Sequence, residues 1–441
     1  MAAEGDCSNF PQPGSLKDIL ELLAKLYKAE SLKKSVGQKL LQDVQTYCKG
    51  SDNFYKSGSS SSEVLSGVLY GAYETRTYIL ETSEQTKYGT YNDLEDLHGT
   101  HEDCVPRALK KCLPQGYSAL YYLYFMCYSG LDTIKGSQWT SETCDGSRSS
   151  DQNLKNWLTD QEGTSDSGHI KRGFSDMDLK NSMGLQVAPV IKQIISHDTP
   201  GPLQKALSYL LFSCDLDHAL LGHACAFLIK FCSEVKGGPK KDFKGYSEEL
   251  KNVCQGLESQ LRQISNGNEG YLWAVSQGTS NVYNDVFRDE SLDAYCTWLR
   301  DNLERIIDSL KAMSSDASTN WTRDKIQTAS TPGPFKYGFI FKDGWTDNDF
   351  SQLTNTIEKL TNSGSNSLVK LNEILKKRIT SEAIAGNTAE SSSGAAAAGA
   401  SVGVLSLGGA GVGAAYGFNL FGLKDIMSGV FGAIRGLVVG F

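Results

Sequence analysis

The sequence predicts an all-α protein, in which a multi-helix bundle with long polar loops is followed by a hydrophobic, Ala/Gly-rich C-terminal helix. Three observations lead to this fold class. Apolar side chains of the first 380 residues recur at the spacing of amphipathic helices. The main strand-like run, residues 337–341, follows Pro332 and Pro334 and is too isolated for us to expect a sheet. Residues 391–423 contain no Asp, Glu, Lys or Arg.

Three helices are expected at the start of the chain. Ser15 and Asp18 form a capping-box-like start, and leucine and isoleucine then repeat at helical spacing over residues 16–26. A second helix is expected over about residues 31–47, packed on the first as a helical hairpin. A third is expected over residues 64–73.

The middle of the chain supplies most of the expected core. Residues 105–130 form the most apolar segment of the body, and their apolar run at 120–127 is too short to span a membrane. Residues 136–168 are rich in Ser, Asp, Gly and Thr, which is typical of an exposed loop, with a short helix at 154–158. Residues 203–235 are dense in Leu, Ala, Phe and Cys, and we expect them to form the centre of the core.

The run GGPKKDFKG interrupts the helical pattern, and we expect a subdomain joint within residues 236–246. Four further helices are expected at about residues 247–264, 291–313, 347–360 and 368–379. The predicted organisation is a helical body, a linker, a transmembrane segment and a short amphipathic end, over residues 1–380, 381–390, 391–423 and 424–441.

The uncharged segment 391–423 would extend about 50 Å as a helix, against roughly 30 Å of bilayer hydrocarbon. Its length favours a single membrane span, whereas its many glycines lower helix propensity and leave a flexible linker as the alternative. Five glycines have the small-xxx-small spacing that allows membrane helices to associate, namely Gly399, Gly403, Gly409, Gly413 and Gly417. The predicted partners are therefore a membrane and, through these glycines, a second copy of the chain.

Charge and cysteine content indicate the setting of the body. The formal net charge of -8 argues against a nucleic-acid partner. Eleven cysteines, all before residue 297, favour disulfides and an oxidising compartment. Glu4 and Asp6 occupy the place of the basic start of a signal peptide, and no apolar stretch follows them. The export route therefore stays open.

Two groups of polar residues invite a functional interpretation. His98, His101, Cys104 and Cys112 carry zinc-ligand side chains, but their spacing matches no established zinc pattern. We interpret them as surface histidines and disulfide cysteines.

The second group suggests a thiol nucleophile with a histidine base, and consists of Asp215, Asp217, His218, His223, Cys225 and Cys232. Asp215 or Asp217 is expected to cap a helix, and the apolar sequence around Cys225 predicts an inert, buried thiol. Cys225 and Cys232 lie about 10 Å apart along one helix, too far to form a disulfide with each other. The sequence predicts no catalytic residue, no cofactor and no metal, and nothing in it supports an enzyme.

Five segments together resemble the secreted-antigen family of Babesia-type piroplasm parasites. They are residues 13–26, 118–126, 201–232 and 330–345 and the Ala/Gly-rich tail, and those at 201–232 and 330–345 (with PFKYGF) are the specific ones. The resemblance implies a mostly helical, exported or exposed antigen with a hydrophobic C-terminus and no known biochemical activity.

The leading hypothesis for function is a non-enzymatic antigen that is held at a membrane by its tail and presents a helical body for contact with host components. The alternative is a membrane-active protein that inserts residues 391–441 into a bilayer. A third possibility is a thiol hydrolase that uses Cys225 or Cys232 with His223.

Overall fold

The computed structural model describes residues 7–48, 54, 64–81, 86–94, 102–124, 157–159, 170–180, 202–213, 216–241, 243–265, 272–274, 292–322, 333–341 and 347–377. The chain divides into two units, Met1–Ile384 and Ala385–Phe441. All described residues belong to the first unit. The predicted span at 391–423, the end at 424–441 and the glycines of the tail lie outside the described residues.

The prediction of a mainly helical body is confirmed. The α-helices of the described part are α1 (Leu16–Lys28), α2 (Glu30–Gln45), α3 (Val64–Ile79), α5 (Cys104–Tyr124), α8 (Pro202–Leu210), α9 (Leu221–Lys236), α10 (Glu248–Ser265), α12 (Leu292–Asn320) and α14 (Asp347–Thr361). Short 3-10 helices are η1 (Gly89–Tyr91), η5 (Asp176–Asp178), η6 (His218–Leu220) and η8 (Gly333–Tyr337). Residues 368–377 are also helical.

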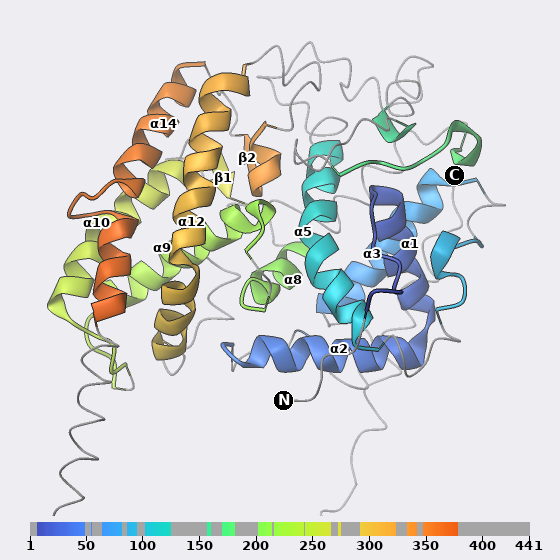
Figure 1. Ribbon diagram of the computed structural model, residues 1–441, viewed down its shortest axis with the longest axis horizontal. Helices are drawn as coiled ribbons and strands as arrows, with labels where there is room; N and C mark the ends of the chain where they lie inside the picture. Colours follow the sequence, from blue (N-terminus) through green and yellow to red (C-terminus); the bar gives the residue numbers. More distant parts are fainter. Residues whose placement is uncertain are drawn as a thin grey trace, which may run out of the picture. The chain divides into compact units, whose positions relative to one another are not determined.

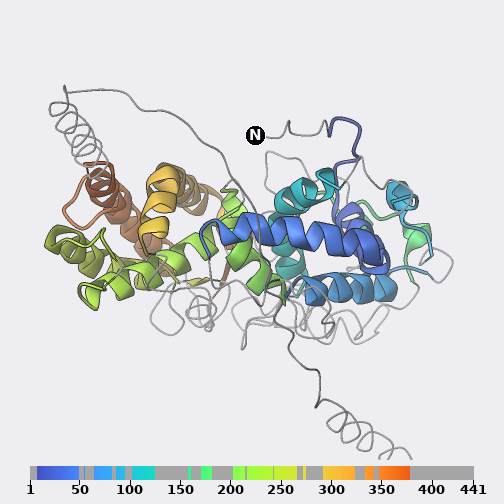
Figure 2. The same ribbon diagram turned by 90° about the horizontal axis from the view of Figure 1, so that it is seen from below.

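Helix α1 begins where its sequence predicts. The Ser15 hydroxyl accepts a hydrogen bond of 3.1 Å from the backbone N–H of Asp18, which satisfies one donor of the first turn. Helix α2 starts directly after Ala29 and contacts α1, as a hairpin requires, but it runs across the end of α1 rather than back along it (Figures 1 and 2). Helix α3, not α2, packs along the apolar face of α1.

The helices of the first unit contact one another in two groups (Figure 1). In the first group α3 packs on α1 and α8, while α5 packs on α1, α2 and α8. In the second group α9 packs on α10 and α12, while α14 packs on α10 and α12. The break at residues 237–247, near the expected joint, therefore separates two helices that pack against each other.

One expectation about strands is wrong. The run Phe339–Phe341 is strand β2, and it pairs antiparallel with β1 (Leu272–Ala274), with Trp273 opposite Ile340. The partner strand lies more than sixty positions earlier in the chain, so no local sequence pattern predicts the pairing. The resulting two-stranded sheet adds a small β element to a helical protein.

The segment of η8 and β2 joins the two helix groups. It contacts α5 of the first group and α12 of the second, and it also lies against η6. The Ser118 hydroxyl of α5 donates a 2.6 Å hydrogen bond to the carbonyl of Phe335. Gly338 has a φ of +72°, and its carbonyl oxygen lies 2.1 Å from the position that a Cβ on Gly222 would occupy. Only two glycines allow so close a backbone approach.

The described residues within 203–235 lie at the centre of the core, as predicted, and residues 221–229 are all buried. Phe212 and Phe227 have ring centroids 5.0 Å apart. The rings of Tyr295 and Trp298 from α12 lie within 5.4 Å of both. All of these ring pairs except Phe212–Tyr295 pack edge-to-face, which stabilises a core beyond the area that it buries.

Candidate functional site

Aromatic and cationic side chains gather where α1 ends and α2 begins, against the middle of α3. The ring centroid of Tyr27 lies 5.7 Å from that of Tyr70 and 5.3 Å from that of Tyr73. The Lys28 ammonium lies 4.3 Å from the centroid of the Tyr73 ring, and the Lys33 ammonium lies 5.6 Å from that of Tyr27. We call these five residues the tyrosine–lysine surface.

Local helix geometry explains the arrangement. Tyr70 and Tyr73 are three positions apart on α3, so their side chains share one face. Tyr27 is in the last turn of α1, which packs on α3 and brings the third ring to the other two. Tyr70 is 47% exposed, and only Met177 among the other large hydrophobic side chains of the described residues is also exposed.

Charges at the tyrosine–lysine surface are incompletely balanced. Glu30 pairs with Lys33 at 2.6 Å, and the carboxylate of Glu74 raises the pKa of Tyr70. Lys28 is exposed, and none of the ion pairs among the described residues includes it. Its ammonium is held by the two tyrosine rings beneath it, an arrangement that is favourable when a cation faces the electron-rich side of a ring.

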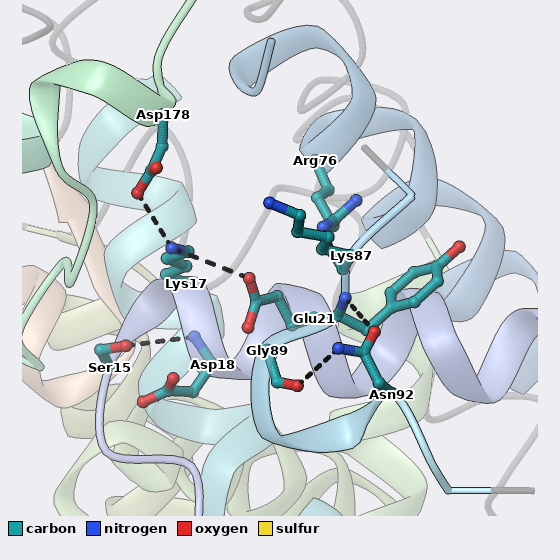
Figure 3. Close-up of polar contacts among 10 residues, drawn as sticks. Ser15, Lys17, Asp18, Glu21, Arg76, Lys87, Gly89, Asn92 and Asp178 are labelled. Carbon is teal, nitrogen blue, oxygen red and sulfur yellow. Dashed lines mark hydrogen bonds and ion pairs between the residues drawn. The ribbon is translucent and has the colours of Figure 1, made fainter. Parts of the chain in front are cut away.

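A partly buried polar group, the Glu21 cluster of Lys17, Glu21, Arg76 and Asp178, joins the neighbouring segments (Figure 3). The Lys17 ammonium lies 3.1 Å from Asp178 and 3.9 Å from Glu21. Glu21 is 4% exposed, and this burial raises the pKa of its carboxyl group, while Lys17 and Arg76 act in the opposite direction. The cluster connects α1, α3 and η5.

The turn at residues 86–94 closes over Glu21. Arg76 donates a hydrogen bond to the carbonyl of Lys87, and its guanidinium lies 4.7 Å from the centroid of the Tyr88 ring. Asn92 fixes the turn, because its side chain accepts a 2.7 Å bond from the Tyr88 N–H and donates a 2.9 Å bond to the Gly89 carbonyl (Figure 3). The Glu21 cluster therefore holds helices α1 and α3 in fixed positions relative to each other.

The first group of residues singled out from the sequence contains one disulfide cysteine, Cys104. Cys104 forms a disulfide with Cys7, which confirms the disulfide interpretation for Cys104. Cys112 is buried and carries a thiol, so the same interpretation is wrong for Cys112. His98 and His101 lie outside the described residues. Within the part of the chain that the structure describes, no three His, Cys, Asp or Glu side chains converge as metal ligands.

The second group is divided among separate structural roles. Asp217 caps η6 by accepting a 2.9 Å bond from the Ala219 N–H, while Asp215 lies outside the described residues. The Nδ1 atom of His218 lies 3.1 Å from the hydroxyl of Ser309 on α12. This contact joins η6 to α12, and the serine is only 4% exposed.

The remaining three members of that group are in the core, as predicted. Burial lowers the pKa of His223 to about 3, and its ring packs edge-on against Tyr117. Burial also raises the pKa of the Cys225 thiol to about 12. The thiol of Cys232 on α9 is hydrogen-bonded with that of Cys254 on α10, which raises the Cys232 pKa. A thiol with such a pKa is unreactive at neutral pH, because the thiolate is the nucleophile.

Sequence reasoning missed the tyrosine–lysine surface. It assigned Tyr73 to the expected third helix and gave Tyr27 and Tyr70 no role. A signal was available in the sequence, since one helix carries three tyrosines within nine residues, at positions 70, 73 and 78. One buried helix face does not need so many aromatic side chains, so the repeat indicates that some of them face outward.

No protein-family model, curated protein or solved structure has a significant match to this chain. Among the described residues, no helix has both the length and the apolar character that crossing a membrane demands.

Proposed function

We propose that the protein is an exported or surface-held antigen whose helical body contacts components outside the cell that makes it, with the segment 391–423 as its membrane anchor. The similarity of its sequence to piroplasm secreted antigens supports this proposal. The observation that carries it is the Cys7–Cys104 disulfide.

The disulfide is evidence about the cellular compartment of the protein, because disulfides persist in some compartments and are reduced in others. Cytosolic thiols are kept reduced, whereas secreted and surface proteins retain disulfides. Cys7 and Cys104 are 97 positions apart and have Cα atoms separated by 5.5 Å, within the range that a disulfide spans. Cys104 opens α5 and is fully buried, so this bond ties the start of the chain to the first helix group.

The compartment is tested by mass spectrometry of the full chain purified from its native source. The sample is alkylated without reduction and then digested. We expect a linked peptide pair containing Cys7 and Cys104, while Cys112 and Cys225 appear as thiols. Alkylation of Cys7 before any reduction would exclude an oxidising compartment and with it the proposed export.

The anchor is tested separately on intact cells that carry a C-terminal epitope tag. Surface protease should remove the body and leave the tag, because Lys424 and Arg435 follow the uncharged segment while Glu382 and Glu390 precede it. Release of the whole chain by carbonate would show that the tail is a linker. Dye release from liposomes by the full chain at nanomolar concentration would instead favour the membrane-active alternative.

A further inference from the structure

We propose that the tyrosine–lysine surface is a docking site for an acidic segment of a partner protein. Carboxylates of the partner would accept hydrogen bonds from the ammonium groups of Lys28 and Lys33, while the rings of Tyr70 and Tyr73 pack against the partner's chain. This inference rests on the proposed function only in that the partner must be reachable by an exported body.

Charge complementarity identifies the partner as acidic. The whole chain has a net charge of -8, so an acidic partner is repelled by most of the protein. At this surface no ion pair among the described residues includes Lys28, whereas the half-buried Lys33 is already paired with Glu30 at 2.6 Å. An exposed ammonium without an ion pair, on a body that is otherwise acidic, favours contact with a carboxylate of a partner at this one place.

The aromatic side chains identify the partner as a protein. Tyrosine is enriched at the energetic centres of protein interfaces, because it buries a large area for little loss of side-chain freedom and keeps a polar hydroxyl. Tyr70 offers its ring to solvent at 47% exposure, beside the two other rings of the surface. An ion-binding surface alone has no need of an exposed ring.

The surface is also prearranged for binding. Lys28 is seated over the rings of Tyr27 and Tyr73, so less side-chain freedom is lost when it binds a carboxylate. Lys25 of α1 and Arg76 of α3 both lie over the Tyr88 ring, which links the two helices that carry the three tyrosines. Helices α1 and α3 therefore present the three tyrosines in one fixed arrangement.

The test uses the full chain in a nonionic detergent and a fluorescein-labelled peptide of twelve glutamates interspersed with leucines, followed by fluorescence anisotropy. The double variant Lys28→Glu/Lys33→Glu should weaken binding about 10-fold or more, since two favourable charge pairs become repulsive. Tyr70→Ala should weaken it about 5-fold, and Tyr70→Phe, which keeps the ring, less than about 2-fold.

The matched control is Lys205→Glu/Lys311→Glu, which changes the net charge by the same amount at two exposed lysines of α8 and α12. It should change binding less than about 2-fold if docking is local. Equal weakening by both double variants would overturn the proposal, as would no measurable binding of the peptide. Circular dichroism of every variant must match that of the parent.

Two further probes examine other anionic partners. Heparin oligosaccharide and phosphatidylserine vesicles replace the peptide in the same assay, with the same variants. The proposal would be overturned if either probe bound more tightly than the peptide and only Lys28→Glu/Lys33→Glu weakened that binding. The partner would then be a sulfated glycan or a lipid surface and not an acidic protein. The disulfide and topology experiments do not depend on these results, so each proposal can fail without the other.

Discussion

Replacing Gly222 with alanine should destabilise the protein by about 2 to 4 kcal/mol, in spite of the higher helix propensity of alanine. Gly222 lies in the first turn of α9, where alanine alone would contribute up to about 1 kcal/mol in favour of the helix. The added Cβ would lie 2.1 Å from the carbonyl oxygen of Gly338 and 2.8 Å from its carbonyl carbon. Both atoms belong to the backbone, so no rotamer change relieves the overlap.

The expected cost follows from what must move. Carbon atoms pack at about 3.5 Å or more, so α9 and the η8–β2 segment must separate by roughly 1 Å or more. That segment carries Phe335, Tyr337 and Phe339, each no more than 1% exposed. Partial loss of contact by three buried aromatic side chains outweighs the gain in helix propensity, because burying one such side chain contributes about 1.5 to 3 kcal/mol.

Urea unfolding followed by far-UV circular dichroism measures the effect. The control is Gly116→Ala in α5, where the atoms nearest to the new Cβ belong to the Ile19 side chain, at 3.1 Å for Cγ2 and 3.3 Å for Cδ1. Its free energy of unfolding should stay within about 1 kcal/mol of the parent. If Gly222→Ala is as stable as Gly116→Ala, the close contact between α9 and the η8–β2 segment does not exist in solution.

Four further outcomes are expected. Because the pKa of Glu21 is raised, the folded state binds its proton more tightly than the unfolded state does, and stability is lost as the pH rises above the pKa of the unfolded state. Glu21→Gln should therefore raise the urea midpoint relative to the parent at pH 7 and not at pH 3. An equal change at both pH values would contradict this. Cys7→Ser removes the disulfide that closes a loop of 97 positions and should lower the free energy of unfolding by about 3 to 5 kcal/mol relative to the oxidised parent. The reduced parent, which also lacks the disulfide, is the control. Cys225 should take up alkylating agent only in denaturant, whereas half-buried Cys296 reacts first in the folded protein; simultaneous labelling would refute the burial argument. A chain ending at residue 384 should give a helical circular dichroism spectrum, and a strand-dominated spectrum would refute the fold class.

The helices were predictable because each one carries its own signal. Ser15 caps α1, Asp217 caps η6, and the apolar repeat of residues 247–264 matches α10 within one position. These are local interactions, made between residues a few positions apart, and they are written in a short window of sequence.

Long-range pairings had no such signal. Leu272 pairs with Phe341, and Cys7 pairs with Cys104, across stretches of chain that no local pattern connects. Eleven cysteines allow many connectivities, and the sequence distinguishes none of them. The ring of Tyr27 meets that of Tyr70 only because α3 packs along α1, where the sequence favoured α2 as the partner.

The two most specific segments of the sequence resemblance, residues 201–232 and 330–345, meet in the structure at Gly222 and Gly338. The segment that contains Gly338 contacts both helix groups, so the glycine contact lies where the two groups are joined. The five residues of the tyrosine–lysine surface all lie outside the segments that carry the resemblance. Under the proposed antigen function, a shared scaffold with a separate surface would allow related chains to keep the glycine contact and to change their partner. Comparison of such chains should therefore show small residues at both glycine positions and varied side chains at positions 28, 33 and 70.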